Sequence, residues 1–205
     1  MKFSLTKKQC FGYALAFSLF FSVFLSLARF SVACDGIRNN VLRLHIIANS
    51  DSDADQELKL KIRDEILNDS DELFQKSNNL SEAISFAKQN TERYEKIAND
   101  VIKKSGFNYS AKVTVGDSHF GTREYDDFTL PAGTYKSLII TLGEAKGHNW
   151  WCVIYPEVCV PTAVKGDLSD SVDGYGCKVA KQSQKYIMRF KAVEIYEEIK
   201  KYINR

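Results

Sequence analysis

The sequence predicts a two-layer α+β domain in which two helices cover one face of a mainly antiparallel sheet. Three observations support this class: an early β-branched strand pattern, two helical patterns directly after it, and further strand patterns separated by turns. An N-terminal apolar segment and a C-terminal helix flank the domain. With 205 residues, of which 44% are hydrophobic, the chain is long enough to bury a core.

The first 33 residues have the pattern of an export segment. Within them, residues 11–28 form an uncharged apolar run, and every charged residue is a cation. The run is longer than a usual signal-peptide core and close to a membrane span, so it is either a cleaved signal peptide or a retained anchor. Residues 31–33 form a small-x-small cleavage site that would start the mature protein at Cys34, which could otherwise be a lipid-modified cysteine. In each case the body is exported, and is secreted or membrane-anchored.

The remainder of the chain is weakly acidic. The whole sequence has 28 cations and 26 acids, and residues 1–33 hold four cations and no acid, which leaves 24 cations against 26 acids. A protein that binds nucleic acid would be expected to present a clustered basic face. The composition therefore argues against a nucleic-acid partner.

Residues 41–48, VLRLHIIA, predict a strand near the centre of the sheet. The acidic run 51–55 that follows resembles a calcium loop, but Gln56 and Ile62 stand where an EF-hand requires glycine and a bidentate glutamate. The acids are better explained as the start of a helix, with Asp53 as its cap and Gln56 completing a capping box. We therefore expect no calcium site.

Two helices are predicted after this strand. The first carries an apolar stripe through Leu58, Ile62 and Ile66, which repeat at a spacing of four residues. The second is predicted as one long helix over residues 80–101, capped by Asn79. Leu60 and Leu67 fall on the far side of the first helix, so we expect it to contact neighbours on both faces, whereas the second helix packs through one face. We expect both helices to lie over the same face of the sheet.

Three further strands are predicted at residues 109–117, 134–143 and 149–156, and turn residues separate them. Residues 161–185 are rich in Gly, Asp, Ser and Lys without an apolar period, which predicts a linker. Residues 186–205 return to helical spacing and predict a C-terminal amphipathic helix.

This pattern divides the chain into four parts. We expect a signal peptide or membrane anchor at residues 1–33, an α+β domain at 34–160, the linker at 161–185, and the C-terminal helix at 186–205.

The cysteines allow a short disulfide. Cys152 and Cys159 bracket a segment in which Pro156 suggests a turn, so the two thiols could meet. Closure of such a small loop would contribute ~2.5 kcal/mol in the chain-entropy model. Both cysteines could equally be reduced and buried as small hydrophobic residues.

No arrangement of catalytic residues stands out. Cys152 could act as a nucleophile with a histidine base and Asp51 as its orienting acid. However, the histidines lie on three separate segments, at His45, His119 and His148. The cysteines at 152, 159 and 177 also lack the C-x-x-C spacing of a zinc site. We therefore expect no enzyme activity, no metal and no cofactor.

An aromatic-rich segment, residues 116–156, is the best candidate for a partner-binding surface. Trp150 and Trp151 are adjacent on a predicted strand, so one should enter the core while the other faces outward. An exposed tryptophan near other aromatic residues would suit a binding hot spot. The alternative is that a covering helix buries both rings. The candidate partner-binding residues are Trp150, Trp151, His119 and Phe120.

Two stretches, RLHIIANSDSDADQELKLKIRDEIL (43–67) and LPAGTYKSLIITLGEAKGHNWWCVIYPEVC (130–159), closely resemble the stage II sporulation protein R family of endospore-forming bacteria. The similarity runs over residues 41–160. Its motifs are specific, and they include the Arg43-Leu44-His45 run and the Asn149-Trp150-Trp151-Cys152 run. After Pro161 the chain is similar only in having a linker and a helix.

The resemblance implies a role in sporulation signalling. It implies a protein made in the forespore and exported into the space between forespore and mother cell. There it would trigger a membrane-embedded aspartic protease to process pro-sigma-E, the precursor of the mother-cell sigma factor. The family brings no established catalytic residues. The alternatives are an exported cysteine-dependent hydrolase acting on the cell envelope, and an anchored structural protein of the envelope.

Overall fold

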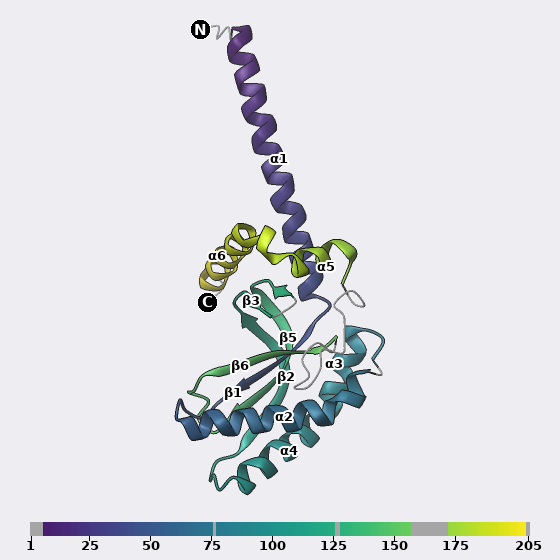
Figure 1. Ribbon diagram of the computed structural model, residues 1–205, viewed down its shortest axis with the longest axis vertical. Coiled ribbons are helices and arrows are strands. Elements are labelled where there is room, and N and C mark those ends of the chain that lie inside the picture. Colours follow the sequence, from purple (N-terminus) through teal and green to yellow (C-terminus); the bar gives the residue numbers. More distant parts are fainter. Residues whose placement is uncertain (1–5, 76, 126–127, 157–171, 204–205) are drawn as a thin grey trace.

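The computed structural model describes residues 6–75, 77–125, 128–156 and 172–203. Figure 1 shows a body of sheet and helices from which one long helix projects. The elements follow in the order α1 (Lys7–Arg38), β1 (Leu42–Ile47), α2 (Asp53–Gln75), α3 (Leu80–Gln89), α4 (Thr91–Lys104), β2 (Ala111–Phe120), β3 (Arg123–Glu124), β4 (Thr129–Leu130), β5 (Gly133–Leu142), β6 (Asn149–Tyr155), α5 (Gly174–Lys181), the 3₁₀ helix η2 (Ser183–Lys185) and α6 (Ile187–Ile203).

The main sheet, within the described residues, has four strands in the order β2-β5-β1-β6. β1 pairs in parallel with β5 and antiparallel with β6, and β2 pairs antiparallel with β5. Two of these three pairings are antiparallel, which confirms the prediction of a mainly antiparallel sheet. The strand predicted near the sheet centre is β1, and it lies between β5 and β6.

Helices α2, α3 and α4 cover one face of the sheet (Figure 1). Between them lies the first core, in which β1 contributes alternate residues and α2 contributes its predicted stripe. Burial of each large apolar side chain stabilises the fold by about 1.5–3 kcal/mol, so this core provides most of the packing energy of the body. Its fully buried members from β1 and α2 are Leu42, Leu44, Ile46, Leu58, Ile62 and Ile66.

The single long helix predicted over residues 80–101 is wrong, because the chain forms two helices that meet at Asn90. The Asn90 side chain donates a hydrogen bond of 2.9 Å to the Phe86 carbonyl, and its backbone has φ −107° and ψ 12°. Asparagine competes in this way for backbone groups that a continuous helix would use. The apolar stripe therefore continues from α3 into α4, although the helix does not. Asn79 caps α3 by accepting a hydrogen bond from the Glu82 backbone amide, as predicted.

The predicted cap of α2 at Asp53 is also wrong, by one residue. Asp53 is already the first helical residue, and the Ser52 hydroxyl accepts a hydrogen bond from the Asp55 amide at 3.2 Å. Serine is a strong N-cap residue, so Asp53 and Asp55 instead lie inside the first turn, near the positive end of the helix dipole. The Gln56 amide reaches back to the Ser50 carbonyl at 2.9 Å.

Asp55 ties the start of α2 to the surrounding loops. Its carboxylate accepts hydrogen bonds from Asn49, Ser50 and the Tyr109 hydroxyl. Burial raises the pKa of this carboxyl, but hydrogen bonds from Ser50, Tyr109 and Asn49 outweigh burial and lower the pKa below its usual value. Asp55 therefore has a structural role at the start of α2.

The predicted linker at residues 161–185 contains helix α5. Asp173 caps it by accepting a hydrogen bond from the Gly176 amide at 2.6 Å, and a side chain at Gly176 would meet Asp173 and Val172 at 2.7 Å. Gly176, one of the glycines that suggested a linker, is thus part of a tight helix start. Residues 161–171 of the predicted linker lie outside the described residues, so the linker prediction is not tested there.

The predicted boundary between export segment and domain, at residue 33, falls inside α1. The buried side chains of Phe30, Ala33 and Cys34 pack against Val179 of α5 and Phe190 of α6. A further core, on the face of the sheet opposite α2, α3 and α4, contains Ile37 of α1. The end of the apolar helix is therefore a structural part of the body.

Candidate interaction surface

The two adjacent tryptophans lie on opposite faces of β6, as alternation along a strand requires. Trp150 packs at the edge of the first core, and the guanidinium carbon of Arg63 lies 4.4 Å from its ring centroid. Trp151 belongs to the second core on the other face, where Arg123 stacks at 3.6 Å. We expected one tryptophan in the core and the other facing outward. Instead, both rings are half-buried, and an arginine guanidinium stacks on each.

The other two residues predicted to bind a partner are neighbours on β2. Phe120 is only 1% exposed and packs edge-on against Tyr135, with 5.5 Å between ring centroids, so it supports the fold. His119 is half-buried near α6. Burial lowers the pKa of His119, and Lys201 of α6 lowers it further. The four predicted residues thus do not form one continuous surface.

Trp151 begins a row of side chains that crosses the sheet on the face opposite α2, α3 and α4. The strand registers place His45 beside Trp151, Ile139 beside His45, and Thr114 beside Ile139. The His45 and Trp151 ring centroids are 6.2 Å apart. Thr114 is exposed and the other three side chains are half-buried. We call Thr114, Ile139, His45 and Trp151 the cross-sheet row, and it offers a partner an apolar and aromatic surface.

Arg43 lies beneath this face and is 0% exposed. Its guanidinium carbon lies 3.8 Å from the Phe120 ring centroid and 5.0 Å from that of Tyr135, and Nη2 donates a 2.7 Å hydrogen bond to the Tyr125 hydroxyl. Burial lowers the pKa of Arg43, while Tyr125 opposes that effect. Nε and Nη1 have no hydrogen-bond partner among the described residues. A charged residue inside the apolar run VLRLHIIA is the sequence signal for this buried cation.

Arg123 connects the cross-sheet row to a neighbouring groove. The groove has a volume of about 340 Å³ and lies between the β3–β4 hairpin and α6. Its walls carry both charge signs as well as apolar groups, a mixture that suits a polypeptide segment. The lining residues include Thr122, Arg123, Glu124, Phe190, Lys191 and Glu194. No sequence pattern indicates the role of Arg123, because that role depends on a two-residue strand.

The structure separates the residues considered for catalysis. Cys152 pairs in register with Leu44, whereas His45 pairs with Trp151, so Cys152 and His45 lie on opposite faces of the sheet. Asp51 does contact His148, with 2.5 Å between carboxylate oxygen and Nδ1, but both side chains are exposed and at the end of the sheet. The backbone amide of His148 is the main cause that lowers the pKa of Asp51. This pair therefore joins two loops and does not face Cys152, which is fully buried.

Cys152 is disulfide-bonded, and Cys10, Cys34 and Cys177 carry free thiols. Its predicted partner, Cys159, lies outside the described residues, so the pairing of Cys152 with Cys159 stays a prediction. No cluster of three or more His, Cys, Asp or Glu side chains in the described part of the chain is placed to hold a metal ion.

Comparison with known proteins agrees with the motifs in β1, α2, β5 and β6. The family described as stage II sporulation protein R matches residues 38–165. Stage II sporulation protein R of Bacillus subtilis (strain 168) is 37% identical over 123 residues, which are 60% of this chain and 55% of the relative. The chain thus matches about half the length of that relative, and no solved structure matches it significantly. The match over residues 38–165 shows that this chain belongs to the stage II sporulation protein R family.

Proposed function

We propose that the chain is an exported sporulation signalling protein that activates a membrane-embedded aspartic protease. The activated protease would process pro-sigma-E, the precursor of the mother-cell sigma factor. The protein would act in the space between forespore and mother cell, outside the cytoplasm in which it was made. Family membership supports the sporulation role, and the protease, its substrate and the location are the further steps of this proposal.

The observation that carries the proposal is the continuity of α1. The helix contains an 18-residue window with a mean hydropathy of 2.0, none of it buried, and is long and apolar enough to cross a membrane. The same helix continues without a break to Arg38, deep in the body. A helix built in this way would hold the folded body against the membrane surface, where a membrane-embedded protease exposes its extracytoplasmic loops.

We propose further that the apolar helix is retained as an anchor. Cleavage after Ala33 would remove Phe30 and Ala33 from the cluster that they share with Val179 and Phe190. The apolar surface of Val179 and Phe190 that this loss exposes to water would cost about 25 cal/mol of folding free energy per Å². A mass measurement of the mature protein tests this step, because a product that begins at Cys34 would contradict a retained anchor.

The cross-sheet row and the adjoining groove are the surface that we assign to the protease contact. Arg123 connects the two, since it stacks on Trp151 of the row and also lines the groove. A body that binds the active state of the protease more tightly than the inactive state would shift the protease toward activity by that difference in affinity. Activation by binding requires no chemistry from the chain itself.

Co-expression of the chain, the protease and pro-sigma-E in a non-sporulating bacterium tests the function, with conversion of the precursor followed by immunoblot. We expect conversion with the parent chain, and a loss of conversion with Trp151→Ala and with Thr114→Arg. Trp150→Ala removes the same ring from the opposite face, and Thr134→Arg changes an exposed threonine that is not in the row, so both should retain conversion.

The result separates the two parts of the proposal. An inactive parent chain would contradict protease activation. An active Trp151→Ala variant together with an active Thr114→Arg variant would leave activation standing but remove the cross-sheet row as the contact. Circular dichroism of each purified variant shows whether the body is still folded.

A further inference from the structure

Helix α6 carries an apolar stripe that is exposed over its whole length. Met188, Ile195, Ile199 and Tyr202 follow one another at spacings of seven, four and three residues, which place them on one side of a helix. Their exposed fractions are 82%, 56%, 54% and 82%. Tyr196 and Ile203 extend the stripe and are also exposed. We call these six residues the α6 stripe, and an exposed apolar surface of this kind marks an interaction site.

The opposite side of α6 holds the helix in place. Phe190 is 4% exposed and meets Phe30 of α1 edge-on, with 5.2 Å between ring centroids. Seven residues further on, on the same side of the helix, Glu197 is 7% exposed and lies 3.7 Å from the Arg38 guanidinium. Because these contacts lie on the side toward α1, the α6 stripe points away from α1 and from the body.

The position of α6 along α1 is the second observation. The uncharged run of α1, residues 11–28, is about 27 Å long at 1.5 Å per residue, close to the hydrocarbon thickness of a bilayer. Arg29 ends that run, and its guanidinium carbon lies 4.3 Å from the Tyr175 ring centroid. The next residue, Phe30, contacts α6. Helix α6 therefore begins at the level where the apolar run of α1 ends.

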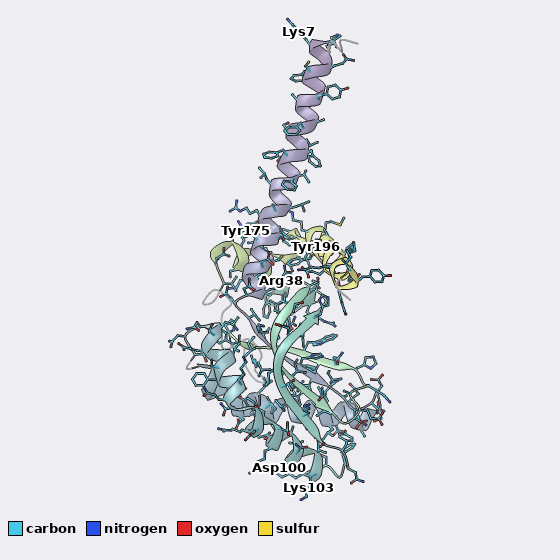
Figure 2. The ribbon with its side chains drawn as sticks, turned by 180° about the vertical axis from the view of Figure 1, so that it is seen from behind. Lys7, Arg38, Asp100, Lys103, Tyr175 and Tyr196 are labelled. Carbon is cyan, nitrogen blue, oxygen red and sulfur yellow. The ribbon has the colours of Figure 1, made fainter. Side chains whose placement is uncertain are left out.

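Tyr175 of α5 and Tyr196 of α6 lie near this same level (Figure 2). Figure 2 shows Tyr175 and Tyr196 at similar heights along the long axis of the molecule, both nearer than Arg38 to the projecting part of α1. Tyrosines are enriched where a membrane meets water, because their rings are apolar at one end and polar at the other.

Charge is the third observation. Residues 174–203 contain seven cations and three acids, a net charge of +4, whereas the chain as a whole carries only +2. Arg189 and Lys200 flank one side of the α6 stripe, and Lys191 flanks the other side. Cations that border an apolar stripe in this way are attracted to the anionic headgroups of a membrane surface.

We propose that α6 is a membrane-interface helix that inserts the α6 stripe among lipid headgroups beside the anchor. The proposal rests on the retained anchor under Proposed function and adds a second, independent membrane contact. One spanning helix leaves the body free to rotate and tilt, whereas a second contact to one side fixes which face is turned toward the membrane. Such a contact would orient the cross-sheet row and groove relative to a membrane-embedded partner.

The test uses the full chain with Ile199→Trp, reconstituted in vesicles of phosphatidylcholine and phosphatidylglycerol. In half of the samples the lipids carry bromine on the upper part of the acyl chain, which quenches nearby tryptophan fluorescence. Subtraction of the parent spectrum, which contains Trp150 and Trp151, isolates the added ring. We expect the added tryptophan to lose intensity in brominated vesicles and its emission to shift to the blue.

Lys201→Trp is the matched control, because this exposed residue lies on the other side of α6. We expect its fluorescence to be quenched less than that of Ile199→Trp. Equal quenching of the two variants, or none for Ile199→Trp, would overturn the placement of α6. A blue shift without quenching would indicate a second copy of the chain on the stripe, and would also overturn it.

Flotation of the same vesicles separates this inference from the anchor. A chain that floats with the vesicles and shows no quenching retains the anchor but refutes the membrane contact of α6. A chain that does not float would refute the anchor, and the placement of α6 with it.

Discussion

The Arg38 guanidinium donates a 2.6 Å hydrogen bond to the carbonyl of Ala132 and thereby joins the end of α1 to the turn before β5. Arg38 also pairs with Asp35 at 2.6 Å and lies 3.7 Å from Glu197 of α6. One buried cation thus connects the apolar helix, the sheet and the C-terminal helix. Its loss should affect the joint between α1 and the body more than the sheet itself.

We expect Arg38→Ala to destabilise the chain by about 3 kcal/mol, because it leaves the buried Glu197 carboxylate without its cation. Urea unfolding of the detergent-solubilised protein measures this change. Asp35→Ala is the control, since the Asp35 side chain is 58% exposed and its loss should cost less than about 1 kcal/mol. Equal effects of the two substitutions would contradict a structural role for the Arg38 contacts inside the body.

The second prediction concerns the stability cost of a side chain at Gly133. It has φ +144°, and a side chain there would meet the Arg38 Cδ atom at 2.6 Å. Gly133→Ala should therefore cost about 1–3 kcal/mol through backbone strain and displacement of Arg38. Gly36→Ala is the control because Gly36 is helical with open space around it, and the substitution should stabilise α1 by about 0.5–1 kcal/mol. The same unfolding measurement tests both, and a neutral Gly133→Ala would show that the turn relaxes.

The sequence predicted those parts of the fold that depend on local pattern. An apolar β-branched run identified β1, alternation identified β2, and four-residue spacing identified α2. For β2 and α2 the signal is periodic because one buried face imposes a period on the sequence. The break at Asn90 was missed, since the apolar stripe continues across it and only a side-chain hydrogen bond interrupts the helix. The cap of α2 was placed one residue too late, at Asp53, because Ser52 and Asp53 are both suitable cap residues.

The candidate site was harder to predict because it is assembled from distant segments. Alternation correctly placed Trp150 and Trp151 on opposite faces, but it carries no information about Arg63 and Arg123, which cover the two rings. The packing of α5 and α6 on α1 was also missed. An apolar helix end that lies in protein and one that lies in lipid have the same composition, so only the three-dimensional contacts of Phe30 distinguish them.

Arg43 gives a prediction about the cost of a buried charge. Replacement of a buried cation by an apolar residue of similar volume is often neutral or stabilising, so we expect Arg43→Met to stay within about 1 kcal/mol of the parent or to exceed its stability. Arg43→Ala should lose about 3 kcal/mol, because it leaves a cavity between Phe120 and Tyr135. Urea unfolding compares the two variants. A large loss in Arg43→Met would show that the ring contacts and the Tyr125 hydrogen bond outweigh desolvation.

The last prediction concerns pH and follows from His45. Burial is the main cause that lowers the pKa of His45 below its usual 6.5, and Arg43 lowers it further, while Asn149 opposes them. The unfolded chain therefore binds a proton at His45 more readily than the folded chain, so the contribution of this residue to stability is present above its unfolded pKa and is lost as the pH falls below it. His119 also has a lowered pKa and acts in the same direction.

Unfolding free energies at about pH 7.5 and about pH 5.5 test this effect. The parent should be less stable at the lower pH, and the difference should become smaller in His45→Gln and again in a variant that also carries His119→Gln. Comparison of each variant with itself at the two pH values removes any loss that comes from the Ser118 contact, because that loss is present at both. An unchanged pH dependence in His45→Gln would show that His45 is solvated enough to accept a proton in the folded state. The half-buried cross-sheet row would then be more open to water than its contacts with Trp151 and Phe120 indicate.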